Sequence, residues 1–138
     1  MHKLYLLPGN NTPEIHFSPH ENIFFIRGRS APEDVRAIYY PVIEGIRTFI
    51  DNIISGEYNI YTPDYPLRFQ VDLTYFNSSS AKFLYDIFSE LKRLKSAGIN
   101  VIVEWFYENE DADMKEAGSD IALLAGMEFT FIPKNRDN

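Results

Sequence analysis

The sequence predicts an α/β protein of one domain, with strands and helices in the order β-β-α-β-α-β-α-β along its 138 residues. Three segments place apolar residues at helical spacing, and each is followed by a glycine. Between them lie segments in which apolar and polar residues alternate, as in strands with one buried face. Strands covered by helices on both faces are usually apolar throughout, so the alternation predicts a mixed sheet with helices mainly on one face.

The first half of the chain reads as a hairpin followed by a helix. Residues 15–17 and 22–28 are the two expected strands, joined by turn-forming residues. Ser30 and Glu33 have the spacing of a capping box, so we expect the helix to begin there. Its apolar stripe runs to residue 53 and Gly56 ends it, while Pro41 inside the stripe should kink it.

The second half alternates between strands and helices. We expect strands at 67–75, 99–106 and 127–132, parallel to one another because right-handed crossovers require it. A helix before Gly98 and another over about 111–125 separate them, and three tyrosines and two prolines should order the loop 56–66. In the strand 67–75, one face should be buried and the other exposed. The buried set is Phe69, Val71 and Leu73, and the exposed set is Arg68, Gln70 and Thr74.

Composition excludes several classes of function. The formal net charge of −7 repels phosphates, so we expect no binding to nucleic acid or to an anionic membrane. The absence of cysteine excludes disulfides, thiolate zinc sites and a cysteine nucleophile. No apolar run approaches the roughly 20 residues that span a bilayer, and the N-terminal apolar stretch is too short for a signal peptide, so we expect a cytoplasmic protein.

Three consecutive serines, Ser78 to Ser80, lie between the expected strand 67–75 and the helix that follows it. With Asn77 as the N-cap, they occupy the first turn, where backbone amides are free and the helix dipole is positive. A phosphate dianion on Ser78 would be stabilised there. The alternative is that the loop Asn77–Ser80 only caps the helix of a constitutive protein-interaction module.

The Asn-Ser-Ser-Ser loop resembles a known regulatory motif. In this order of elements it is similar to the phosphorylatable Asp-Ser-Ser-Gly loop of anti-sigma factor antagonists, the STAS domains, with Asn77 and Ser80 in place of the aspartate and glycine. It is more similar to the STAS-like SiaC-type regulatory phosphoproteins, which carry Tyr-Leu-Asn-Thr/Ser-Ser-Ser at this loop. Further SiaC-like marks are residues 12–15, 32–33 and 105–107, so the resemblance covers nearly the whole chain.

The resemblance implies a single STAS-like regulatory domain over residues 1–138, without enzymatic activity. Ser78 would be the phosphoacceptor of a dedicated serine kinase, and a metal-dependent protein phosphatase would restore it. In the best-known branch of the family, the unmodified form binds and activates a diguanylate cyclase. The implied function is a partner-switching regulator whose binding to an effector is gated by phosphorylation of Ser78.

The expected partner surface surrounds this loop. Lys82 follows Ser78 by one helical turn and should lie near a phosphate there. Parallel strands share one end, so residues after the strands 67–75 and 99–106 should meet near Ser78. We expect Trp105 to be core. The expected partner contacts are Phe76, Asn77, Ser79, Ser80, Lys82 and Tyr107.

Other chemistries have weaker support in the sequence. A serine hydrolase needs a positioned base, yet no Gly-x-Ser-x-Gly is present and His2, His16 and His20 all lie near the N-terminus. No glycine-rich phosphate loop indicates a nucleotide. The acidic run 108–116 has Met114 where an EF-hand loop requires glycine, so a solvated helix start explains it better than calcium. We therefore predict no catalytic residue, cofactor or metal site.

Overall fold

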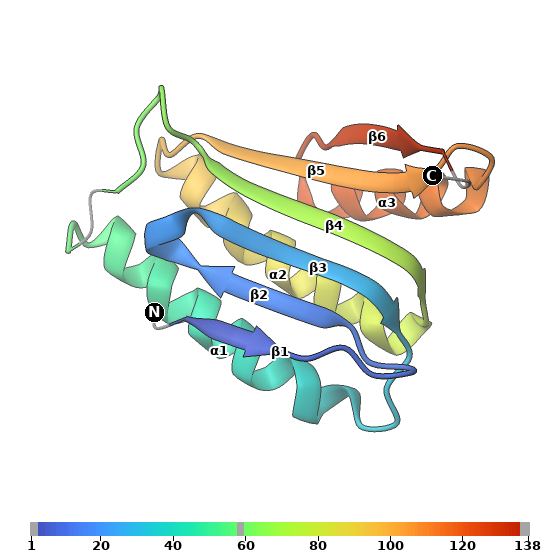
Figure 1. Ribbon diagram of the computed structural model, residues 1–138. Helices are drawn as coiled ribbons and strands as arrows, with labels where there is room; N and C mark the ends of the chain where they lie inside the picture. The colour runs from blue at the N-terminus through green and yellow to red at the C-terminus, as the bar shows by residue number, and fades with distance from the viewer. Residues whose placement is uncertain (1–2, 58–59, 136–138) are drawn as a thin grey trace.

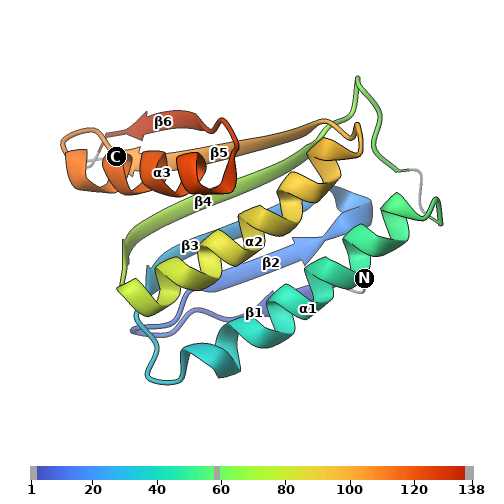
Figure 2. The same cartoon turned by 180° about the vertical axis from the view of Figure 1, so that it is seen from behind.

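The computed structural model describes residues 3–57 and 60–135, and within them one six-stranded sheet carries three α-helices. The strands are β1 (Leu4–Leu6), β2 (Glu14–Ser18), β3 (Ile23–Ser30), β4 (Leu67–Phe76), β5 (Val101–Glu108) and β6 (Thr130–Lys134). The helices are α1 (Val35–Ile54), α2 (Ser78–Ser96) and α3 (Ala112–Ala125), and one 3-10 turn, η1 (Pro19–Glu21), joins β2 to β3. All three α-helices lie on the same face of the sheet, and the other face is uncovered (Figures 1 and 2). The expected α/β class and the one-sided mixed sheet are confirmed.

The strands lie side by side in the order in which they occur along the chain. β1, β2 and β3 are antiparallel, whereas β3, β4, β5 and β6 are parallel, which confirms the expected direction of the last three. The strand β1 was not predicted, and it pairs with β2 through only three residues. A segment that short gives no clear alternation, so only its pairing with β2 identifies it as a strand.

β4 lies between β3 and β5 and shows the predicted division into two faces. Phe69 is fully buried and Leu73 is 3% exposed, and both pack into the core beneath the helices. Arg68 and Thr74 are exposed on the uncovered face, and Gln70 is half-buried beside Glu104, to which its amide donates a hydrogen bond. The expectation that the polar set is more exposed than the apolar set is confirmed.

The start of α1 differs from the sequence prediction. The capping box of Ser30 and Glu33 is wrong, because Ser30 ends β3 and its side chain is fully buried. The N-cap is Asp34, whose Oδ1 accepts a hydrogen bond from the amide of Ala37 at 3.2 Å. α1 then runs through Pro41 to Ile54 as one helix. A local pattern of serine and glutamate cannot show that the serine hydroxyl has more distant partners.

The helix ends follow the glycines. Gly56 (φ +87°), Gly98 (φ +92°) and Gly126 (φ +69°) all adopt the left-handed conformation that favours glycine after a helix. β6 begins at Thr130 rather than at Met127, because the amide of Met127 still bonds the carbonyl of Ala122 at 3.0 Å as part of the C-cap of α3. Residues 127–129 therefore connect α3 to β6 and are not part of the strand.

The loop between α1 and β4 is anchored by a buried tyrosine. Tyr61 donates its hydroxyl to the carbonyl of Pro19 at 2.9 Å and stacks on Tyr65, with ring centroids 6.2 Å apart. Thr62 and Tyr65 form an isolated bridge. Burial raises the pKa of Tyr61. Two of the three predicted ordering tyrosines thus act as expected, and Tyr58 lies outside the described residues.

Gly118 lets α3 pack directly on Trp105, the tryptophan of β5. A Cβ atom at Gly118 would lie 2.6 Å from the indole ring, so any larger residue forces the two apart. The indole Nε1 donates a hydrogen bond to the carbonyl of Met114 at 3.1 Å. Trp105 is fully buried, which confirms it as core.

Candidate functional site

The first turn of α2 is capped by Asn77, as the sequence predicts. Asn77 has an extended backbone, and its Oδ1 accepts a hydrogen bond from the amide of Ser80 at 2.9 Å. The amide of Asn77 donates to the carbonyl of Ser30 at 3.0 Å, which fixes the loop to the end of β3. The helix therefore has its N-cap without a contribution from the serine hydroxyls.

The three serines have different environments. Ser78 and Ser79 are exposed, and among the residues that the structure describes neither hydroxyl has a hydrogen-bonding partner. Ser80 is 0% exposed and bonds Ser30 twice: its Oγ accepts from Ser30 Oγ at 2.8 Å and donates to the Ser30 carbonyl at 3.0 Å. The expectation that Ser80 contacts a partner is corrected, because its hydroxyl holds α2 against β3 inside the protein.

The buried hydroxyls form a directed chain. Each hydroxyl has one hydrogen. Ser80 gives its hydrogen to the Ser30 carbonyl and Ser30 gives its own to Ser80, so in the remaining 2.7 Å contact Tyr39 must be the donor to Ser30 Oγ. Burial raises the pKa of Tyr39, which keeps the phenol protonated for this role. α1, β3 and α2 are thereby joined directly beneath the exposed serines.

Lys82 interacts within α2. Its Nζ lies 2.8 Å from Asp86 Oδ2, one turn further along α2, and 4.9 Å from the centre of the Phe83 ring. The side chain of Lys82 is 68% exposed. The sequence placed it near a phosphate on Ser78, but its ammonium already has a carboxylate partner.

Phe76 and Tyr107 are both half-buried, but they belong to different surroundings. Phe76 lies edge-on to the Trp105 ring, with centroids 6.0 Å apart, just before the serine loop. The ring centre of Tyr107 lies 5.6 Å from Lys115 Nζ. Tyr107 lines a separate hollow, and none of the three serines lines that hollow. The two aromatic residues expected at one site are therefore not brought into one hollow.

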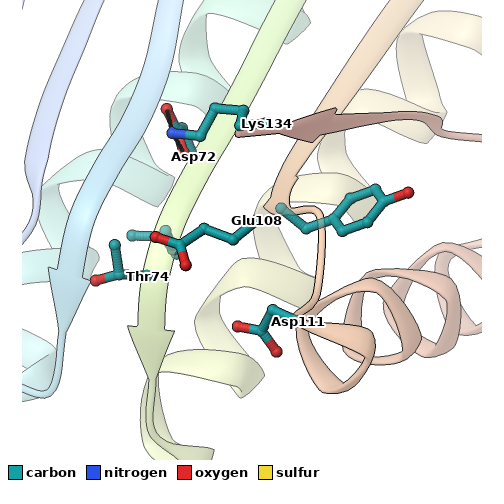
Figure 3. A pocket seen from close by; sticks show the side chains of 7 residues that line it. Asp72, Thr74, Glu108, Asp111 and Lys134 are labelled. Atoms are coloured by element: carbon teal, nitrogen blue, oxygen red, sulfur yellow. Dashed lines mark hydrogen bonds and ion pairs between the residues drawn. The ribbon is translucent and has the colours of Figure 1, made fainter. Parts of the chain in front are cut away.

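The hollow beside Tyr107, of about 160 Å³, is acidic (Figure 3). Lys134 reaches from β6 across β5 to Asp72, with its Nζ 2.7 and 2.8 Å from the two carboxylate oxygens. Glu108 and Asp111 point into the same space, and Asp111 also caps α3 by accepting from the amide of Met114 at 3.0 Å. Within residues 3–57 and 60–135, no three carboxylate or histidine side chains are grouped to hold a metal ion.

Of the histidines weighed as catalytic bases, His2 lies outside the described residues. The ring of His16 on β2 makes edge contacts with the rings of Tyr5 and Phe25, with centroids 5.1 and 5.5 Å away, and His20 belongs to η1. Neither lines a hollow beside the serine loop. Among the described residues, no histidine therefore lines the hollow that contains Ser79.

A family model for SiaC family regulatory phosphoproteins matches residues 7–134. The chain belongs to this family. Apo-SiaC from Pseudomonas aeruginosa has a similar fold, with a TM-score of 0.74 at 24% identity over 97% of this chain and 99% of that chain. A second structure of SiaC of Pseudomonas aeruginosa gives 0.75 at 23% identity, over 99% and 100% of the two chains.

A third similar structure is a complex. A chain in the crystal structure of diguanylate cyclase SiaD with its activator SiaC from Pseudomonas aeruginosa matches with a TM-score of 0.80 at 22% identity, over 95% of this chain and 99% of that chain. At these identities the likeness shows a shared SiaC fold. No curated protein sequence matches significantly. None of the helices in the described ranges combines the length and apolar character needed to cross a bilayer.

This SiaC-family chain also has a surface groove that was not predicted from its sequence. Two hollows between α1 and α2 share Tyr40, Lys82 and Phe83, and we call the pair the α1–α2 groove. The hollow at the start of α2 is lined by Val35, Arg36, Tyr40, Ser79, Lys82 and Phe83. One signal was present in the sequence, since Lys82 and Phe83 follow Ser79 at the three- and four-residue spacing that gives one helix face.

Proposed function

We propose that this SiaC-family protein is a non-enzymatic partner-switching regulator in which reversible phosphorylation of Ser78 gates binding to an effector. One observation carries the proposal. Ser78 is exposed at the start of a helix that Asn77 already caps, and no described residue uses its hydroxyl. A family of regulatory phosphoproteins needs an accessible acceptor, and Ser78 can be modified without breaking a bond of the fold.

The physical effect of the modification favours an off-switch. A phosphate adds about −1.5 to −2 charges with a hydration shell to the rim of the sheet. A partner that buries this loop against apolar or acidic surface must remove that shell, and the cost exceeds what one neutral hydrogen bond returns. The free amides of the first turn of α2 stabilise the phosphate within the protein, so the fold persists in both states.

The proposed partners are a serine kinase, a metal-dependent protein phosphatase and an effector that is a diguanylate cyclase. The effector is supported by the similar fold of the chain in the SiaD–SiaC complex. Around Ser78, the residues proposed to contact the effector are Phe76, Asn77, Ser79, Lys82 and Tyr107. Phe76 offers a half-buried ring next to the loop, whereas Tyr107 would extend the contact toward α3.

The test is a comparison of affinities. The Ser78→Ala variant serves as bait in a lysate of its native cells, and the retained protein is then titrated against wild type, Ser78→Ala, Ser78→Asp and enzymatically phosphorylated protein. Wild type and Ser78→Ala should bind equally, Ser78→Asp more weakly and the phosphorylated form weakest, because one carboxylate mimics a dianion only in part.

A matched control distinguishes the effect of position 78 from the effect of an added negative charge. Ser119→Asp places the same charge on an exposed serine of α3 and should leave affinity unchanged. Equal affinity of all four forms for the retained protein would leave the loop as a helix cap in a constitutive interaction module.

A further inference from the structure

The hollow at the start of α2 brings Ser79 and Arg36 to one place. Arg36 comes from the first turn of α1 and Ser79 from the first turn of α2, and both side chains are exposed at the mouth of the α1–α2 groove. Ser78 and Ser80 do not line this hollow, and the hydroxyl of Ser80 is buried. Of the three serines, only Ser79 shares the hollow with an arginine.

The charges in this hollow are not balanced. Lys82 is paired with Asp86, so these two residues together contribute no net charge. Arg36 has neither an ion pair nor a hydrogen bond with any residue in the described ranges. An unpaired guanidinium and an unpaired hydroxyl thus line one hollow, and a guanidinium suits a phosphate because its planar donors can bond two phosphate oxygens at once.

We propose that Ser79 is a second phosphorylation site and that Arg36 holds its phosphate. The proposal rests on the proposed function, because the same class of serine kinase must act on the loop. In the reaction, Ser79 Oγ forms a bond to the γ-phosphorus of a nucleoside triphosphate held by the kinase. The bond from that phosphorus to the β,γ-bridging oxygen breaks, the hydroxyl proton passes to a base of the kinase, and a nucleoside diphosphate leaves.

The two phosphates have different consequences. A phosphate on Ser78 stands in solvent at the rim and acts by repelling a partner. A phosphate on Ser79 turns toward α1 and pairs with Arg36, so it links α1 to α2 and closes one end of the α1–α2 groove. The rim and the groove are then separately controlled by neighbouring residues.

Occurrence is tested by site-localised mass spectrometry of wild type and Ser78→Ala protein from native cells. Phosphate on Ser79 in both proteins is the expected result. Phosphate on Ser78 alone overturns this proposal and leaves the proposed function standing. Phosphate on Ser79 but never on Ser78 supports this proposal and overturns the proposed function of Ser78. A loop that is unmodified under every growth condition overturns both proposals.

Recognition by Arg36 is tested in the full chain with phosphoserine encoded at position 79 or, as the matched control, at position 78. Phosphorus NMR should give a second phosphate pKa at position 79 that is lower by about 0.5 than in the same protein carrying Arg36→Gln. Arg47→Gln is the charge control, because Arg47 also lines the groove from α1 but is paired with Glu90. An Arg36→Gln effect that is absent at position 79, or equal at position 78, overturns the assignment.

Discussion

Replacing Ser80 by alanine should destabilise the protein far more than the same change one residue earlier. The truncation removes the group that accepts from Ser30 Oγ at 2.8 Å. Tyr39 and Ser30 then hold two hydroxyl hydrogens for one mutual bond, so one buried donor is left without an acceptor. The Ser30 carbonyl keeps its bond from the amide of Asn77 at 3.0 Å. One unsatisfied buried donor costs about 1–3 kcal/mol, which is the expected loss in the free energy of unfolding.

The adjacent serine supplies the control. Ser79→Ala makes the same chemical change in the same helical turn, but the hydroxyl it removes is exposed and has no partner among the described residues. Its effect on the free energy of unfolding should stay within about 0.5 kcal/mol. Urea denaturation followed by circular dichroism measures both. At a slope of about 2 kcal/mol per molar, a loss of 2 kcal/mol moves the midpoint by about 1 M.

A third variant tests the direction of the chain. Tyr39→Phe removes the first donor of the hydrogen-bond chain and leaves every remaining hydroxyl hydrogen with an acceptor. It should therefore lower the free energy of unfolding by less than Ser80→Ala. Coincident midpoints for Ser79→Ala and Ser80→Ala would refute the buried chain. A greater loss from Tyr39→Phe than from Ser80→Ala would show that the direction of donation is reversed.

Three further predictions concern the sheet and its edges. Leu73→Ala should lower the free energy of unfolding by about 2–4 kcal/mol through lost burial and a cavity, and Arg68→Ala on the open face of β4 by less than about 1 kcal/mol; equal urea midpoints would contradict the one-sided sheet. The Arg27 guanidinium, 2.6 Å from Glu14, holds the pKa of that carboxyl below its ordinary value in the folded protein. The pair therefore stabilises the fold fully at a pH above the pKa that Glu14 has in the unfolded chain, and this stabilisation is lost as the pH falls through the lower pKa of Glu14 in the folded protein. Carbon-detected NMR should show the titration midpoint of Glu14 rising in Arg27→Gln, and an unchanged midpoint would exclude the pairing. Burial raises the pKa of Tyr61, so Tyr61→Phe should leave the ultraviolet titration of the folded protein unchanged up to about pH 10, and a smaller absorbance change in that range would place the phenol in solvent.

The sequence predicted what depends on local pattern. The alternation in β4 separates Phe69 from Arg68 because successive side chains point to opposite faces. The glycines after the helices and the cap by Asn77 also depend only on neighbouring residues. These features follow from backbone geometry within a few positions, and the structure shows each of them.

The features that were missed join residues distant in sequence. Ser30 has the local pattern of a helix cap, yet its partners are Tyr39, nine residues away, and Ser80, fifty residues away. The third serine of the loop is buried for the same reason, and no local rule distinguishes it from its neighbours. The α1–α2 groove depends on how two helices pack, which places Arg36 rather than Lys82 as the unpaired cation.

The identity of strand order and chain order has a consequence for how the protein folds. Because strands that are consecutive in sequence are also neighbours in the sheet, each new strand adds to the edge formed by the strand before it. Each connection closes over at most one helix, but the parallel pairings still join residues far apart in sequence, such as Phe25 and Gln70, so they should form more slowly than the hairpins. During synthesis, the hairpin of β2 and β3 can form first, and each following helix–strand unit adds to an edge that already exists. The growing sheet therefore always offers its next strand a template, until β6 closes the series.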